Sequence, residues 1–138
     1  MPGSFVIDAS VAAKLHFIED GSDQAAAFVE GAEGLIAPDL LHVEMASIAA
    51  KNVRRGFVSQ ERARLAVEAV TDLLDTAVPM AELAPRAFEL AATHGFSAYD
   101  GAYLALAESR DLKVITADAK LVRLAHQAGL ARLVLLLE

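Results

Sequence analysis

Residues 4–10 read Ser-Phe-Val-Ile-Asp-Ala-Ser, a short apolar run that ends at a carboxylate, Asp8. A run of this length bounded by polar residues is typical of a buried strand. Similar short runs recur at residues 35–37, 77–80, 113–116 and 133–137. The chain therefore contains five predicted strands, spread from its beginning to its end.

Longer segments with apolar residues three or four positions apart separate these strands, and they predict helices at residues 39–55, 59–74, 83–94, 97–109 and 119–128. Suitable residues lie at their ends, namely Asp39, Ser59 and Ser97 as N-caps, with Gly56, Gly95 and Gly129 as terminators. Strands that alternate with helices predict an α/β fold. We expect a three-layer arrangement with a mainly parallel sheet of about five strands and helices on both faces.

The composition limits the possible functions. A chain of 138 residues is expected to form one domain, residues 1–138. The absence of Cys excludes disulfide scaffolds, iron–sulfur clusters and cysteine nucleophiles. The net charge of −7 does not favour a general nucleic-acid or membrane binder, so any RNA contact must be local or made through cations. No apolar stretch is long enough for a membrane span, and the start does not resemble a signal peptide. We expect a soluble cytoplasmic domain.

Several acidic residues interrupt apolar patterns. Glu44 lies between Leu40 and Ile48 on the apolar stripe of its predicted helix. Asp100 lies one helical turn before Leu104, within another apolar segment. Asp8 and Asp118 instead follow predicted strands, where they could also serve as helix N-caps, and Asp100 could complete a capping box with Ser97.

The carboxyl ends of parallel strands and the first turns of the following helices share one edge of the sheet. All four acids can meet there. Two carboxylates ~5 Å apart at an effective dielectric of ~20 repel by about 3 kcal/mol, so cations are needed to neutralise them. Oxygen ligands without Cys favour Mg²⁺ or Mn²⁺ over Zn²⁺. Such ions can activate water to hydrolyse a phosphodiester.

These motifs resemble those of the PIN-domain family, specifically the VapC-like ribonuclease toxins of toxin–antitoxin pairs. The resemblance rests on residues 5–10, Glu44, residues 97–107 and residues 115–118. It implies a metal site formed by Asp8, Glu44, Asp100 and Asp118, with Ser10 and Thr116 as supporting hydroxyls. It also implies endonucleolytic cleavage of single-stranded or loop RNA with Mg²⁺, for which Mn²⁺ substitutes, together with a homodimer and a cognate antitoxin.

Two positions depart from the family pattern. Many relatives carry a further acid shortly after the fourth, whereas Ala119, Lys120 and Leu121 follow Asp118 here, which leaves open whether one or two ions are held. Gly101 occupies a position where relatives commonly have Ala, and a glycine inside a helix costs about 1 kcal/mol.

Two groups of basic residues are candidate RNA contacts: Lys14 and Lys120, which flank the proposed acidic site, and Lys51, Arg54 and Arg55, which lie together near a helix end. Two other functions remain open at this stage. A Mg²⁺-dependent phosphatase or phosphotransfer domain could use Asp8 as nucleophile, although Ser10 occupies the place where such enzymes carry a second Asp. A catalytically weak PIN-like binding module is the non-enzymatic alternative.

Overall fold

The computed structural model describes residues 3–138. Across these residues the sheet has five strands, β1 (Ser4–Ile7), β2 (Gly34–Pro38), β3 (Thr76–Val78), β4 (Val114–Thr116) and β5 (Val134–Leu136). Their order in space is β3-β2-β1-β4-β5, and every neighbouring pair is parallel. The predicted α/β class and parallel sheet are therefore confirmed.

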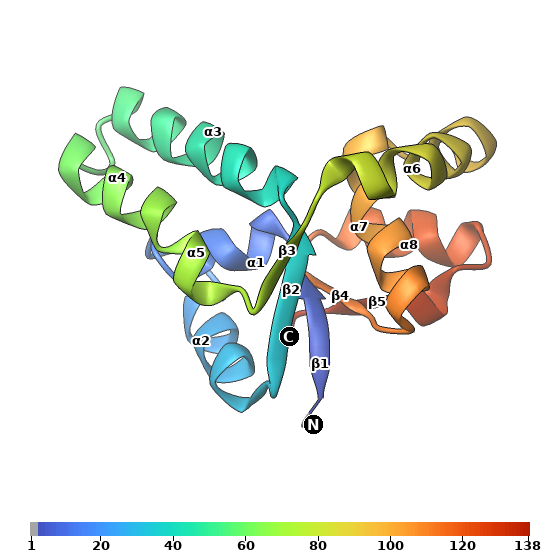
Figure 1. Ribbon diagram of the computed structural model, residues 1–138. Helices are drawn as coiled ribbons and strands as arrows, with labels where there is room; N and C mark the ends of the chain where they lie inside the picture. The colour runs from blue at the N-terminus through green and yellow to red at the C-terminus, as the bar shows by residue number, and fades with distance from the viewer. Residues whose placement is uncertain (1–2) are drawn as a thin grey trace.

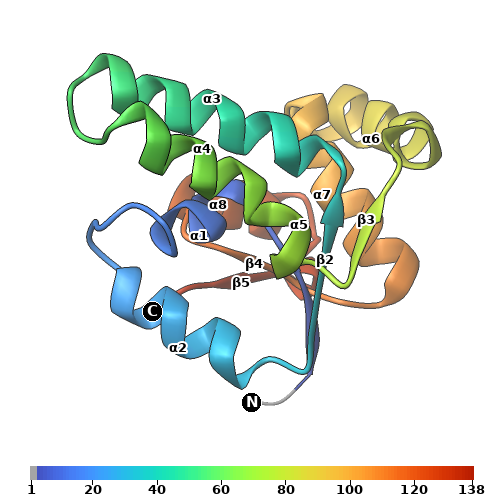
Figure 2. The same cartoon turned by 60° about the vertical axis from the view of Figure 1, so that its left-hand side comes forward.

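Helices cover both faces of the sheet (Figure 1). One group consists of α1 (Ala9–Lys14), α2 (Ser22–Gly31), α3 (Leu40–Arg54), α4 (Gln60–Glu68) and α5 (Val70–Leu73). The other consists of α6 (Met80–His94), α7 (Ala98–Arg110) and α8 (Ala119–Gln127). The chain moves toward β3 through the first group and toward β5 through the second, so right-handed crossovers place the groups on opposite faces. Helices α3 and α4 form a hairpin that projects beyond the sheet (Figures 1 and 2).

The core is densest around the two central strands. Val6 and Ile7 of β1 and Val114 and Ile115 of β4 have no exposed surface. Both faces of these strands are covered by helices, which explains why their sequences are continuous apolar runs rather than alternating ones. None of the helices in residues 3–138 combines the length and apolar content required to cross a bilayer.

Several element boundaries differ from the sequence prediction. The single helix predicted at residues 59–74 is divided at Ala69 into α4 and α5. The strand predicted at residues 77–80 ends at Val78, because Pro79 lacks an N–H for the ladder and Met80 already begins α6. Helices α1 and α2 were not predicted. Helix α1 has only 6 residues, which are too few to establish a periodic pattern.

The predicted helix ends are largely confirmed. Ser59 and Ser97 cap α4 and α7 through their side chains, and the predicted terminating glycines have positive φ angles. Asp39 does not cap its own helix. Its Oδ1 instead accepts a hydrogen bond of 3.1 Å from the amide of Met80, at the start of α6. The carboxylate thus satisfies a free N–H of a different helix, which no local pattern indicates.

Candidate active site

Two carboxylates lie at the carboxyl ends of adjacent strands. Asp8 follows β1 and Asp118 lies two residues after the end of β4, and these strands are paired through Ile7 and Ile115. Both acids are helix N-caps: Asp8 Oδ1 accepts from the Val11 amide at 3.2 Å, and Asp118 Oδ1 caps α8. Each capping bond goes to Oδ1, so the second carboxylate oxygen is not needed for the cap. The capping role is therefore compatible with a ligand role.

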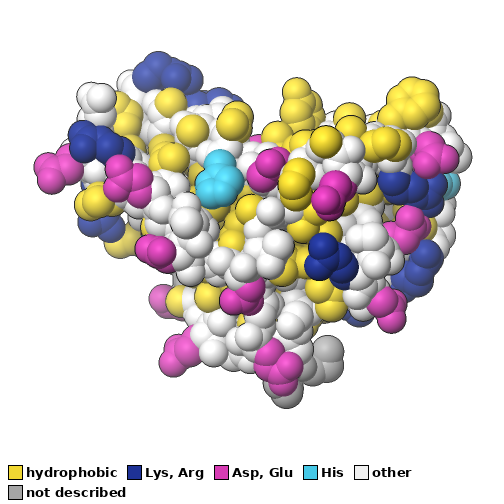
Figure 3. All heavy atoms as spheres, in the orientation of Figure 1, with side chains coloured by type: hydrophobic (Ala, Val, Ile, Leu, Met, Phe, Trp, Pro, Cys, Tyr) yellow, Lys and Arg dark blue, Asp and Glu magenta, His cyan; other side chains and the backbone are white. Residues whose placement is uncertain are grey.

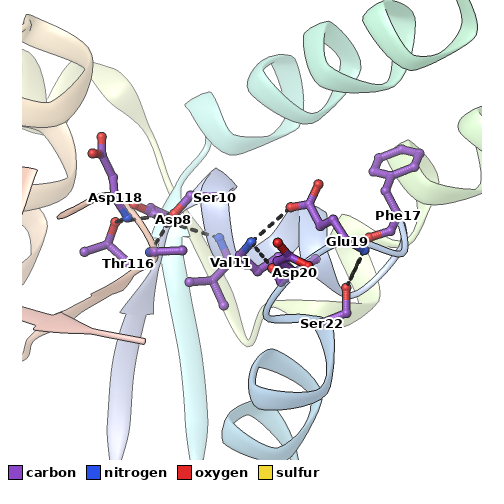
Figure 4. A network of polar contacts seen from close by, with 11 residues as sticks. Asp8, Ser10, Val11, Phe17, Glu19, Asp20, Ser22, Thr116 and Asp118 are labelled. Atoms are coloured by element: carbon purple, nitrogen blue, oxygen red, sulfur yellow. Dashed lines mark hydrogen bonds and ion pairs between the residues drawn. The ribbon is translucent and has the colours of Figure 1, made fainter. Parts of the chain in front are cut away.

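Two hydroxyls connect these strand ends (Figure 4). The Ser10 hydroxyl donates to Asp8 Oδ1 at 2.6 Å and accepts from the backbone amide of Ala117 at 2.8 Å. The fully buried Thr116 lies 3.3 Å from it, oxygen to oxygen, and accepts from the Asp118 amide at 3.1 Å. Ser10 and Thr116 thus hold the backbone and side chains of both acidic positions in place.

Glu44 lies on α3 at the margin of the buried stripe, which Leu41, Met45 and Ala49 form, rather than at its centre. Its Oε1 accepts a hydrogen bond of 2.5 Å from the hydroxyl of Tyr103 on α7. We call the end of the sheet that carries Asp8 and Asp118 the acidic edge. The tyrosine is 3% exposed, so its ring is held in the core while its hydroxyl reaches the acidic edge. The sequence analysis did not assign Tyr103 to the site, although its position three residues after Asp100 places both on one helix face.

Asp100 is half-buried in the first turn of α7, where its amide donates to the Ser97 hydroxyl at 3.0 Å. The next residue, Gly101, packs directly on α6. A Cβ at this position would lie 2.8 Å from the carbonyl oxygen of Ala87. The glycine therefore allows a close approach of the two helices, and that approach sets where α7 presents Asp100.

The four acids interact electrostatically in pairs: the charge of Glu44 acts on Asp8, that of Asp100 on Glu44, and that of Asp118 on Asp100. Burial, opposed by three hydrogen bonds and reinforced by the charge of Glu44, raises the pKa of Asp8 to about 6. Burial also raises the pKa of Glu44, and the charge of Asp100 adds to it. The pKa of Asp100 is raised by burial and then by the charge of Asp118. Within residues 3–138 none of these acids forms an ion pair with Lys or Arg.

This geometry can be compared with known proteins. The sequence of residues 5–127 matches the family model of the PIN domain. The chain belongs to the PIN-domain family. Ribonuclease VapC3 of Pyrobaculum aerophilum is 36% identical over 118 residues, which cover 84% of this PIN domain and 90% of the relative. Ribonuclease VapC9 of Mycobacterium tuberculosis is 35% identical over 116 residues, covering 84% and 87% of the two chains.

A solved structure shares the fold of this PIN domain. The crystal structure of Mycobacterium tuberculosis VapC20 aligns with a TM-score of 0.67 and 16% sequence identity. The alignment covers 86% of this chain and 93% of VapC20. At this identity the likeness concerns the arrangement of the sheet and helices.

The donor set of this PIN domain fits a hard divalent cation, because it consists of carboxylate and hydroxyl oxygens, and among residues 3–138 no Lys or Arg is ion-paired with these carboxylates. Among residues 3–138, no three acidic or histidine side chains are already arranged so that they could hold one metal ion together. The buried carboxylates repel one another, and a bound cation would remove this repulsion.

The candidate RNA-contacting residues are distributed unevenly in this PIN domain. Lys14 Nζ already donates hydrogen bonds to Glu19 Oε1 at 3.2 Å and to the backbone carbonyl oxygen of Asp20 at 2.5 Å. Lys120 lies in the first turn of α8, where its amide donates to Asp118 Oδ1 at 2.9 Å, so this lysine adjoins the acids. The remaining three lie on the α3–α4 hairpin: Lys51 and Arg55 line one cleft, and Arg54 lines a groove that includes Ala46 and Ala63.

Proposed function

We propose that this PIN domain is a metal-dependent endoribonuclease of the VapC type and the toxin of a toxin–antitoxin pair. The observation that carries the proposal is the series of four acids, Asp8, Glu44, Asp100 and Asp118, at one sheet edge without an ion-paired cation. Identity of 35–36% to named VapC ribonucleases over most of the chain supports the activity.

In this proposal the four acids hold Mg²⁺, and Mn²⁺ substitutes for it. When bound, the ion supplies Lewis-acid stabilisation of the phosphodiester and a water of lowered pKa. The residues of the chain orient this chemistry. Ser10 and Thr116 fix the directions of Asp8 and Asp118, while Tyr103 fixes the carboxylate of Glu44.

Protons compete with the cation for these carboxylates. Because burial raises the pKa of Asp8 to about 6, this group holds a proton under weakly acidic conditions and must release it to become a ligand. We therefore infer that metal binding, and with it RNA cleavage, declines as the pH falls toward 6. No protein nucleophile is required, since water is the attacking group.

The proposed substrate is single-stranded or loop RNA. VapC20, which has the same fold, is described as a sarcin–ricin loop cleaving toxin. We also propose that the chain acts in the cytoplasm, where an RNA substrate and a protein antitoxin would meet it, and that it forms a homodimer, as the family resemblance implies. Light scattering coupled to size-exclusion chromatography measures the oligomeric state directly.

The decisive experiment is cleavage of structured total RNA with Mg²⁺ or Mn²⁺, compared with EDTA and with the Asp100→Asn variant. Asp72→Asn, which changes an exposed acid in α5, is the matched control. Metal-dependent cuts that disappear in Asp100→Asn but persist in Asp72→Asn support the proposal. Equal cleavage by Asp100→Asn and the parent protein rules out the site, and hydrolysis of p-nitrophenyl phosphate without RNA cleavage identifies a phosphatase instead.

A further inference from the structure

A cleft of about 840 Å³ lies on the α3–α4 hairpin, away from the strand ends. Its walls come from the segment after α1, the second half of α3, the connection between α3 and α4, and the beginning of α4. We call it the basic cleft, and the residues that matter for its chemistry are Ile18, Ile48, Lys51, Arg55, Phe57 and Arg62. Sequence analysis singled out two of its cations but neither Phe57 nor Arg62.

The charge of the basic cleft is opposite to that of the whole chain. Lys51, Arg55 and Arg62 are exposed, and among residues 3–138 none of them forms an ion pair. The acid in the lining, Glu19, is paired with Lys14 at 3.2 Å. Dark-blue side chains gather at this end of the hairpin in Figure 3. A chain with a net charge of −7 thus concentrates free positive charge in one hollow.

Exposed apolar side chains accompany these cations. Phe57 is 73% exposed and Ile18 is 94% exposed, although burial would be favourable for both. An exposed aromatic ring beside unpaired Lys and Arg is the combination that binds single-stranded nucleic acid, because bases stack on the ring while cations bind the phosphates. A purely apolar ligand would leave the three cations without partners.

Helix α3 connects the basic cleft to the acidic edge. Glu44, Ile48 and Lys51 follow one another at spacings of four and three residues, so they share one face of α3. Arg55, the C-cap residue of α3, lies four residues after Lys51 and continues this row. At 1.5 Å per residue, Lys51 and Arg55 lie roughly 10 Å and roughly 16 Å from Glu44 along the axis. A strand cleaved at the acids can therefore continue along α3 into the basic cleft.

We propose that the basic cleft binds the RNA strand to one side of the scissile phosphodiester, with Arg55 and Arg62 on phosphates and Phe57 stacked on a base. This inference rests on the proposed ribonuclease function for its substrate. It assigns the cleft a role in holding the strand, whereas the acids perform the chemistry.

Binding tests the cleft independently of catalysis. The probe is a fluorescein-labelled 15-nucleotide oligouridylate in EDTA, added to the Asp100→Asn protein so that the strand stays intact. The double variant Arg55→Gln/Arg62→Gln is compared with Arg64→Gln/Arg110→Gln, which removes the same charge from exposed positions outside the basic cleft. Thermal melts verify that both variants are folded.

Each phosphate contact contributes roughly 0.7 log units of affinity at 0.1 M salt, so losing two contacts predicts roughly 25-fold weaker binding. The slope of log affinity against log salt should also fall by roughly 1.4. The Arg64→Gln/Arg110→Gln control should keep the parent slope. Phe57→Leu should weaken binding roughly fivefold or more, because a stacked base is lost, whereas the exposed Phe88→Leu should not.

Failure of the cleft can be distinguished from failure of the acidic site. With Mn²⁺ and an intact Asp100, the Arg55→Gln/Arg62→Gln variant should hydrolyse bis(p-nitrophenyl) phosphate like the parent protein but show a raised KM for RNA. A parent protein that hydrolyses neither bis(p-nitrophenyl) phosphate nor RNA contradicts the proposed function. The oligouridylate assay then still tests whether the basic cleft binds RNA. Equal affinities of the two double variants, or no binding by the parent, overturn the cleft proposal.

Discussion

Replacement of Asp8 by Asn should stabilise the metal-free protein at neutral pH. Asn has nearly the same shape and can still accept the hydrogen bonds from Ser10 and Val11 at its oxygen. It removes the negative charge and replaces the second carboxylate oxygen with an amide NH2 group. Because Asp8 is 8% exposed, its charge is poorly solvated in the folded chain and well solvated in the unfolded one.

The magnitude follows from the shift in pKa. Burial raises the pKa of Asp8 from 3.8 to about 6, and each unit corresponds to about 1.36 kcal/mol, so the charged carboxylate destabilises the fold by about 3 kcal/mol. Well below pH 3.8 the group is protonated in both states and this destabilisation is absent. As the pH rises from 4 to above 6, the folded chain loses this free energy, because it holds the proton more tightly than the unfolded chain.

The assay is urea denaturation in EDTA between pH 4.5 and 8, with Asp72→Asn as the control. The free energy of unfolding of the variant should exceed that of the parent by about 1 kcal/mol at pH 4.5 and by about 3 kcal/mol at pH 8. The larger difference corresponds to roughly 10 °C in Tm for a domain of this size. Added Mn²⁺ should stabilise the parent and leave Asp8→Asn largely unaffected. A stability difference that does not change with pH, or a variant less stable than the parent at pH 8, would refute the reasoning.

Three further predictions concern neighbouring residues and the metal. Tyr103→Phe keeps the buried ring but removes the hydrogen bond to Glu44. Calorimetry should therefore show the Kd for Mn²⁺ rising by roughly tenfold. An unchanged Kd would show that Tyr103 does not position Glu44. Gly101→Ala should lower the free energy of unfolding in urea by roughly 1–3 kcal/mol, despite the helix propensity of Ala, because its Cβ would meet the Ala87 carbonyl; a stabilised variant would contradict this packing. Finally, Mn²⁺ at 100 times its Kd should stabilise the parent by about 2.7 kcal/mol and EDTA should reverse it, so a flat Tm across the titration would argue against the acidic site.

Much of the fold could be predicted because its signals are local. Residues 4–7 and 113–116 are continuous apolar runs, and such runs are typical of strands covered on both faces. The terminating glycines and the Ser caps act within one helical turn, so they can be recognised without knowledge of the partner elements. The short helix α1 and the division at Ala69 could not be predicted, because tertiary packing rather than local periodicity sets them.

The proposed site divides in the same way. Asp8 and Asp118 could be placed together from sequence because adjacent parallel strands end at a common edge. Glu44 attracted attention because an acid on an apolar stripe is unusual. Its partner Tyr103 lies 59 positions away on another helix, and no local spacing indicates that their side chains meet.

The sequence by itself determined the α/β class, the parallel sheet and the positions of the acids along the chain, since these depend on periodicity and on neighbours within a few residues. Only the tertiary structure decided that Tyr103 orients Glu44, that Asp39 caps α6, and that Gly101 admits the backbone of Ala87. It also brought Arg62 and Phe57 into one cleft with Lys51. The physical reason is that such contacts join separate elements, and their geometry is set by how helices pack on one another and on the sheet.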